Sequence, residues 1–138
     1  MTKSTKIISV LITLFIITSF SSTPSKILAR KVGGKTPIKD VKTNKKIQEL
    51  GKYCVEEYNK SLRKYKQIMQ DDNIELLSFV EVVEAETQVV SGIKYYLKIS
   101  AFSFGIPKIF NAELVVKSWE NEKELVHFSP FYYANDDN

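Results

Sequence analysis

The sequence predicts an α+β domain in which one long helix packs across a four- to five-stranded antiparallel β-sheet. Between residues 44 and 64, apolar residues recur at steps of three and four, which is the period of one face of a helix. After residue 73 the period changes to two, and turn residues divide this part of the chain into strand-like segments. A helix followed by consecutive strands is typical of an antiparallel sheet covered on one face.

Residues 1–29 are interpreted as a secretory signal peptide. Lysines precede the apolar run 7–17, and small residues follow it. The run is shorter than the about 20 residues that a membrane span needs, so a transmembrane anchor is the minor alternative. Cleavage after Ser21 and cleavage after Ala29 both remain open. Residues 30–138 then form a single domain that is secreted or vacuolar through the secretory pathway, with no membrane attachment after signal removal.

The charge balance argues against a nucleic-acid partner. The full chain has 20 Lys and Arg residues against 16 Asp and Glu residues. Signal removal takes away lysines and no acid, so the mature chain is nearly neutral. Basic residues gather before residue 67, and we assign them to a solvated helix face because no nucleic-acid motif accompanies them. Cys54 is the only cysteine, so no intrachain disulfide is expected.

The helix is expected to begin near Thr43 or Asn44, both of which are good N-cap residues. Its apolar face carries Ile47, Leu50, Cys54, Val55, Tyr58 and Leu62. Gly51 lies within the helix, where a glycine costs about 1 kcal/mol relative to alanine. We therefore expect the sheet to lie close against Gly51. The preceding segment, residues 30–42, is expected to be loose or extended.

Four strands are expected in the second half of the chain, over residues 76–90, 93–104, 109–117 and 124–131. The alternation of the second is regular, whereas that of the first fails at Val82-Val83. A β-bulge is expected at this point because a bulge inserts an extra residue and breaks the period of two.

Catalytic and metal-binding residues are few. His127 has no Asp or Ser partner at a suggestive spacing and is interpreted as a partly buried strand residue. Cys54, on the apolar helix face, is interpreted as a buried hydrophobic residue, and one His and one Cys far apart make no metal site. Glu81, Glu84 and Glu86 alternate along a strand, which favours solvent exposure over a catalytic acid pair. We predict no enzyme activity, no metal and no cofactor.

Asn59 is a candidate modification site. Asn59-Lys60-Ser61 is an N-glycosylation sequon in a chain expected to enter the secretory pathway. The sequence leaves the occupancy of this sequon open.

Two predicted turns carry apolar residues where polar residues are usual. Val89 and Val90 precede Ser91-Gly92, and Trp119 follows Ser118 in a later turn. Alternate hairpins of an antiparallel meander open at the same end of the sheet, so these two turns are expected side by side. A paired apolar edge with a Trp on rigid hairpins is typical of an interface hot spot.

Four short motifs together point to one known family. Gln88-Val89-Val90-Ser91-Gly92 matches its Gln-x-Val-x-Gly loop, Gly33-Gly34 matches its N-terminal glycines, and the Trp119 hairpin matches a third element. Residues 50–59 resemble its helix signature, Leu-Ala-Arg-Phe-Ala-Val-x-x-x-Asn. In these motifs, and from about Val32 to Phe131, the sequence resembles the plant cystatins (phytocystatins), which inhibit papain-like cysteine proteases.

Two departures from the family pattern stand out. Ser118 replaces the proline that usually precedes the Trp, which makes the second hairpin less pre-organised. Gly51 and Cys54 replace the alanines of the helix signature, a difference that concerns the fold more than the function.

The resemblance implies reversible, competitive, tight-binding inhibition of papain-like cysteine proteases, with a role in plant defence. Gly33-Gly34, the Gln88–Gly92 hairpin and the hairpin of Ser118 and Trp119 would form a wedge that fills the active-site cleft. Gln88 would fix the base of the loop and Gly92 would close the turn with a positive φ. The catalytic thiolate would be blocked, not captured. A monomer is expected, with a domain-swapped dimer as an alternative.

Two other functions remain open. One is a secreted enzyme or small-molecule binder that uses the concave face of a similar curved sheet, because a fold does not define a function. The residues expected on that face, among them Tyr95, Leu97 and Phe110, offer no catalytic group. The other is a cystatin-fold protein without inhibitory activity, which Ser118 leaves open.

Overall fold

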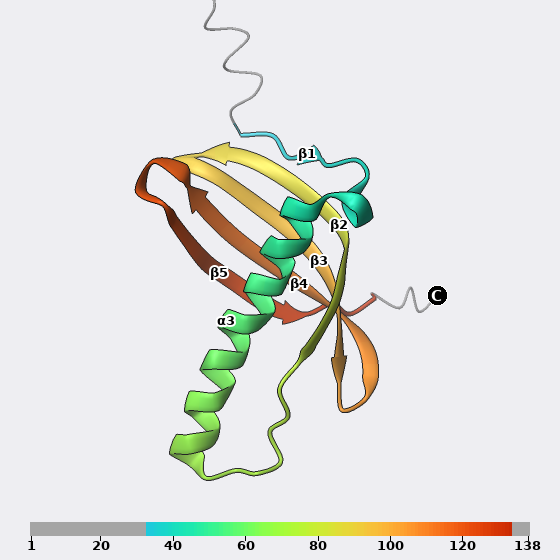
Figure 1. Cartoon of the computed structure of the whole chain (residues 1–138), viewed down its shortest axis with the longest axis vertical. Coiled ribbons are helices and arrows are strands. Elements are labelled where there is room, and N and C mark those ends of the chain that lie inside the picture. Colours follow the sequence, from blue (N-terminus) through green and yellow to red (C-terminus); the bar gives the residue numbers. More distant parts are fainter. Residues whose placement is uncertain (1–32, 134–138) are drawn as a thin grey trace, which may run out of the picture. The chain divides into compact units, whose positions relative to one another are not determined.

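One antiparallel sheet with a helix across one face forms the domain, which confirms the predicted α+β class (Figure 1). The computed structural model describes residues 33–133, so the predicted signal peptide and its two candidate cleavage sites lie outside the described residues. Of the described residues, 34–133 belong to one compact unit. The elements are β1 Thr36–Pro37, the 3-10 turn η1 Val41–Thr43, α3 Lys45–Met69, β2 Ser78–Val90, β3 Gly92–Ser103, β4 Ile106–Lys117, the 3-10 turn η2 Ser118–Glu120 and β5 Glu122–Pro130.

Helix α3 begins as its cap residue predicts. Asn44 is the N-cap, and its side-chain oxygen accepts a hydrogen bond from the backbone N–H of Ile47 at 3.3 Å. The helix extends to Met69, beyond the last apolar position that the sequence assigned to the core. In this last part Tyr65 and Ile68 are exposed. Within residues 33–133, no helix is long and apolar enough to span a bilayer.

The core lies between α3 and one face of the sheet. The predicted apolar face of the helix, except Leu62, packs against alternate residues of the three long central strands. Its most deeply buried large side chains are Ile47, Leu97, Ile99, Leu114, Val55, Val82 and Cys54. Burial raises the pKa of the Cys54 thiol to about 12, which keeps it protonated and unreactive at neutral pH.

Helix and sheet lie close together at Gly51. A Cβ atom at this position would lie 2.2 Å from Val82 Cγ2, which confirms the expected close contact. The predicted bulge is also present, since the pairing of β2 with β3 shifts between Val82 and Glu84. Gln48 hydrogen-bonds both backbone groups of Val82: Oε1 accepts from the N–H at 2.9 Å, and Nε2 donates to the carbonyl at 3.1 Å. The helix therefore supplies partners at the point where the ladder is irregular.

The segment before the helix is more ordered than the sequence indicated. Thr36 pairs with Thr87 and Pro37 with Glu86, so β1 adds a fifth strand at the edge of the sheet. The backbone N–H of Ile38 donates to the carbonyl of Ala85 at 2.9 Å. A two-residue strand held by backbone bonds leaves no side-chain period in the sequence, which explains why the sequence predicted only a loose or extended segment here and left four or five strands open.

Asn59 ties the helix to the start of the sheet. Its side-chain nitrogen donates to the carbonyl of Leu77 at 2.8 Å, and its oxygen accepts from the Leu77 N–H at 2.9 Å. Asn59 is only 7% exposed. The nitrogen that a glycan would modify is thus buried and bonded, so the folded structure favours an unoccupied sequon.

Asn59→Ala is expected to lower the free energy of unfolding by about 2–3 kcal/mol, because it leaves the N–H and C=O of Leu77 without partners inside the protein. Ser61→Ala is the matched control, since it removes the same sequon but leaves the contacts of Asn59 intact and should change stability by less than about 0.5 kcal/mol. Urea unfolding of the bacterially expressed domain measures both values. Equal stability of the two variants would show that the contacts of Asn59 contribute nothing.

Candidate functional site

The two apolar hairpins open at the same end of the sheet, as the meander predicts (Figure 1). The β2–β3 turn contains Ser91, and the β4–β5 turn contains η2. Ile93 pairs with Val116, so the first turn lies beside the end of β4. We call this end of the sheet the hairpin edge and define it by residues 88–93 and 117–122.

Gly92 permits the close contact between the two hairpins. Its φ is +116°, a conformation that residues with a side chain rarely adopt. This positive φ is the one expected of Gly92 as the residue that closes the turn. A Cβ atom there would lie 2.8 Å from the backbone oxygen of Val116 and 3.3 Å from Cγ of Lys117. Both the turn and the packing of its neighbour therefore require a glycine.

The hairpin edge exposes apolar side chains on both hairpins. Val89 is 50% exposed, Val90 42% and Trp119 66%. Ile93, directly after the turn, is exposed as well. The sequence did not single out Ile93, because its alternation marks it only as the first residue of a strand. These four side chains form the apolar part of the hairpin edge.

Ion pairs of Lys117 restrain the second hairpin, in which Ser118 stands at the position of the expected proline. Lys117 Nζ lies 3.4 Å from a Glu120 carboxylate oxygen and 3.8 Å from one of Glu122. A hydrogen bond with the Glu122 carboxyl, and then the charge of Lys117, lower the pKa of Glu120. Asn121, at φ +50°, donates its N–H to the Ser118 carbonyl at 3.4 Å. Trp119 is thus presented by a turn with its own restraints.

Gln88 lies at the base of the first hairpin, in the position that the resemblance implies. It pairs with Lys94 across the ladder. The hydroxyl of Tyr96 donates to Gln88 Oε1 at 2.6 Å. Both side chains are on the face of the sheet away from α3, because they alternate with the core residues of their strands. Gln88 is therefore fixed by a neighbour that the sequence did not identify.

The predicted N-terminal glycines directly precede β1. Gly33 has a φ of +98°, and a Cβ atom at Gly34 would meet no atom within 4 Å. The pairing of Thr36 with Thr87 brings Lys35, the residue before β1, toward Gln88. The chain around Gly34 has room for contact with a partner.

The other candidate residues have ordinary structural roles. His127 is exposed, not partly buried as expected, because it lies on an edge strand and faces away from the helix. Its Nε2 lies 2.9 Å from the Ser129 hydroxyl. Glu84 forms an ion pair with Lys98 at 2.7 Å. Within residues 33–133, no group of three His, Cys, Asp or Glu residues is placed to hold a metal ion.

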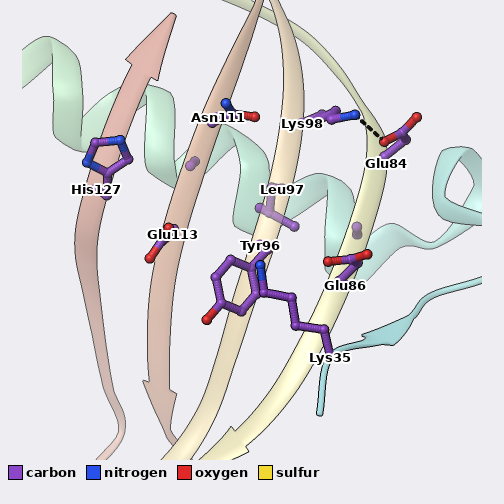
Figure 2. A pocket seen from close by; sticks show the side chains of 11 residues that line it. Lys35, Glu84, Glu86, Tyr96, Leu97, Lys98, Asn111, Glu113 and His127 are labelled. Carbon is purple, nitrogen blue, oxygen red and sulfur yellow. Dashed lines mark ion pairs between the residues drawn. The ribbon is translucent and has the colours of Figure 1, made fainter. Parts of the chain in front are cut away.

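A shallow hollow of about 340 Å³ lies on the face of the sheet away from α3 (Figure 2). Charged and polar side chains line it, including Lys35, Glu86, Tyr96, Glu113 and His127. The opposite, helix-facing side of the sheet is filled by the apolar core. A second hollow, of about 650 Å³, adjoins the helix-facing side of the sheet, and Tyr58, Leu62 and Phe110 are among the residues that line it.

Comparison with known proteins identifies the family. A family model described as "Aspartic acid proteinase inhibitor" matches residues 38–131. Cysteine proteinase inhibitor 10 of Oryza sativa subsp. indica is 44% identical over 108 residues, which cover 72% of each chain. Cystatin-1 of Zea mays is 34% identical over 125 residues, 88% of this chain and 84% of its own. Dimeric human cystatin F shares the fold, with a TM-score of 0.53 at 16% identity over 76% of this chain and 91% of the other.

The descriptions of the family model and of the rice relative agree on proteinase inhibition and differ on the class of proteinase. The family model names aspartic proteinases, whereas the rice relative names cysteine proteinases. The identity to the rice and maize proteins extends over most of each chain and includes the helix and the sheet. The chain belongs to the plant cystatin family of proteinase inhibitors.

Proposed function

We propose that the protein is a reversible, competitive, tight-binding inhibitor of papain-like cysteine proteases. One observation carries the proposal: a complete Gln-x-Val-x-Gly hairpin exposes Val89 and Val90 on the same edge of the sheet as Trp119. The plant relatives bear the name of cysteine proteinase inhibitors. Exposed apolar side chains on rigid hairpins suit insertion into a cleft, where each Å² of apolar area removed from water contributes about 25 cal/mol.

The hairpins resist cleavage because their backbone is already paired. The β2–β3 ladder continues up to Val90 and Gly92, so only Ser91 lies outside it. A protease draws its substrate into an extended strand, and the tip of this hairpin cannot extend without breaking that ladder. The inhibitor therefore fills the cleft and excludes substrate, and the catalytic thiolate is blocked without a covalent bond.

Each proposed contact residue has a distinct role. Trp119 is the large anchor on the primed side, and Ser118 leads into its turn. Val89, Val90 and Ser91 meet the centre of the cleft. Gly33 and Gly34 let the N-terminal arm lie in the unprimed subsites without side-chain clashes. Ile93, exposed beside the first turn, extends the apolar contact.

We also propose secretion or vacuolar delivery, supported by the basic and then apolar residues at the start of the chain. Proteases of those compartments, including those of organisms that feed on plants, are then the accessible targets. The monomer is the inhibitory form. A domain-swapped dimer would open the first hairpin and so remove Val89 and Val90 from the hairpin edge.

Steady-state assays of the mature protein against papain, pepsin and trypsin test this function. We expect competitive inhibition of papain that is fully reversed on dilution, with pepsin and trypsin unaffected. Inhibition of pepsin but not papain would reassign the protein to the aspartic class. Inhibition of none would identify it as a cystatin-fold protein without inhibitory activity.

Gly92→Ala is expected to weaken papain inhibition about tenfold or more, because the positive φ and the Val116 oxygen both oppose a Cβ atom there. Gly105→Ala is the matched control. Gly105 also has a positive φ, +72°, but lies in the β3–β4 turn at the other end of the sheet. The Gly105→Ala variant should be less stable than the natural protein and should inhibit papain equally well. Equal inhibition constants for the two variants would show that the first hairpin does not contact the protease.

Truncation through Gly34 is expected to raise the dissociation rate of the papain complex much more than it changes the association rate. A protein that begins at Gly33 is the control and should keep most of its residence time. Rapid-mixing and displacement kinetics give the two rates separately. A full residence time after truncation through Gly34 would remove the arm from the mechanism.

Ser118→Pro is expected to slow dissociation from papain a few-fold, because proline reduces the freedom that the turn loses on binding. The preceding residue, Lys117, has an extended and not a helical backbone, with φ −109° and ψ 94°, which lies close to the region preferred before proline. A neutral result would mean that the ion pairs of Lys117 already order the turn.

Trp119→Ala is expected to weaken binding by about 2 kcal/mol or more, roughly 30-fold, through loss of a large aromatic anchor. Tyr132→Ala is the control, since Tyr132 is an aromatic residue of comparable exposure beyond the end of β5. Inhibition constants for papain measure both. If neither Trp119→Ala nor Tyr132→Ala changes the inhibition constant, the second hairpin does not contact the protease.

A further inference from the structure

Tyr96 lies between the N-terminal arm and the first hairpin and contacts both. Its hydroxyl donates to Gln88 Oε1 at 2.6 Å, and Lys35 Nζ lies over its ring, 3.8 Å from the centroid. Figure 2 shows the Lys35 side chain extending from the arm across the Tyr96 ring. One side chain therefore touches two segments that are 53 residues apart in the sequence and that both belong to the proposed wedge.

A second lysine restrains Tyr96 from within its own strand. Lys94 Nζ lies 4.9 Å from the centre of the Tyr96 ring. Lys94 is itself held by an ion pair of 2.7 Å with Glu113 on β4. The ring is thus fixed in the orientation that presents its hydroxyl to Gln88 and its face to Lys35.

Backbone pairing alone holds the start of the arm weakly. β1 consists of two residues and pairs with β2 at Thr36 and Pro37, and one further backbone hydrogen bond joins Ile38 to Ala85. Lys35 is the residue that links Gly34 to this short strand. A cation over an aromatic ring is attracted to the ring face even at an exposed site, so the contact of Lys35 with Tyr96 adds to what so short a strand provides. The Lys35 contact is therefore well placed to set the direction of the arm.

We propose that Tyr96 is a positioning residue that couples the N-terminal arm to the first hairpin through Lys35 and Gln88. The proposal rests on the proposed inhibitory function, because the coupling matters where both segments enter one cleft. Ordering the arm before the protease arrives reduces the entropy lost on binding. The arm and the hairpin then dissociate as one unit.

A double-mutant cycle with Lys35→Met and Tyr96→Leu tests the coupling in papain dissociation kinetics. Lys35→Met is expected to raise the dissociation rate about threefold in the natural background and to have no effect when Tyr96 is already Leu. Lys35→Arg should restore the natural rate, because Arg keeps the cation over the ring. Tyr96→Phe, which keeps the ring but loses the hydroxyl, should raise the dissociation rate while preserving the effect of Lys35→Met.

Lys98→Met provides the matched control. Lys98 lies on the same strand, with its cation 4.8 Å from the centre of the Phe131 ring. Its effect on dissociation should be small and should add to that of Tyr96→Leu. If Lys35 and Tyr96 only stabilised the fold, their substitutions would lower the melting temperature. Lys35→Met would then change the dissociation rate by the same factor with and without Tyr96→Leu. Additive effects of Lys35→Met and Tyr96→Leu would overturn the proposal.

NMR of the free protein separates this proposal from the proposed function. The resonance of the Gln88 side-chain amide should shift on Lys35→Met in the natural background and stay unchanged in the Tyr96→Leu background. If the natural protein does not inhibit papain but this pattern is observed, the inhibitory function fails and the coupling stands. If papain is inhibited and Lys35→Met does not shift the Gln88 resonance, the proposed coupling is wrong and the proposed function stands.

Discussion

The close approach of Gly92 to Val116 is the contact on which the hairpin edge depends. The β3–β4 ladder brings the first turn against the end of the neighbouring strand, and only a residue without a Cβ atom fits at the contact point. Its positive φ also closes the turn that exposes Val89 and Val90. One backbone constraint therefore fixes both the shape of the first hairpin and its distance from the second.

The contacts between α3 and the sheet support the hairpin edge. α3 lies close to the sheet at Gly51 because Val82 Cγ2 fills the space of the missing side chain. Gln48 bonds to the backbone of Val82, where the bulge interrupts the ladder. At the far end, Asn59 ties the helix to Leu77. The rigid edge that the proposed function needs is thus supported by a helix anchored by side-chain amides at both ends of its core face.

Features that disturb a local pattern of residues could be predicted from the sequence, and contacts that leave no such mark could not. The cap at Asn44, the bulge at Val82 and the close contact at Gly51 each disturb a local pattern of residues. β1 and the contact of Tyr96 with Lys35 leave no such mark, because they depend on which residues the strand register places opposite each other. The alternation of β3 assigned Tyr96 to the face away from the core but did not name its neighbours. The sequence predicted no exact end for α3, because the last turns before Met69 have no core to cover and so carry no apolar period.

Binding to a papain in which the catalytic cysteine is replaced by serine tests the central claim most directly. If the hairpin edge fills the cleft without reacting with the thiolate, this inactive papain should bind the inhibitor with an affinity within about tenfold of that of the active enzyme. It should also release intact inhibitor. Loss of binding to the serine variant, or an inhibitor recovered with a cleaved or modified first hairpin, would contradict the account.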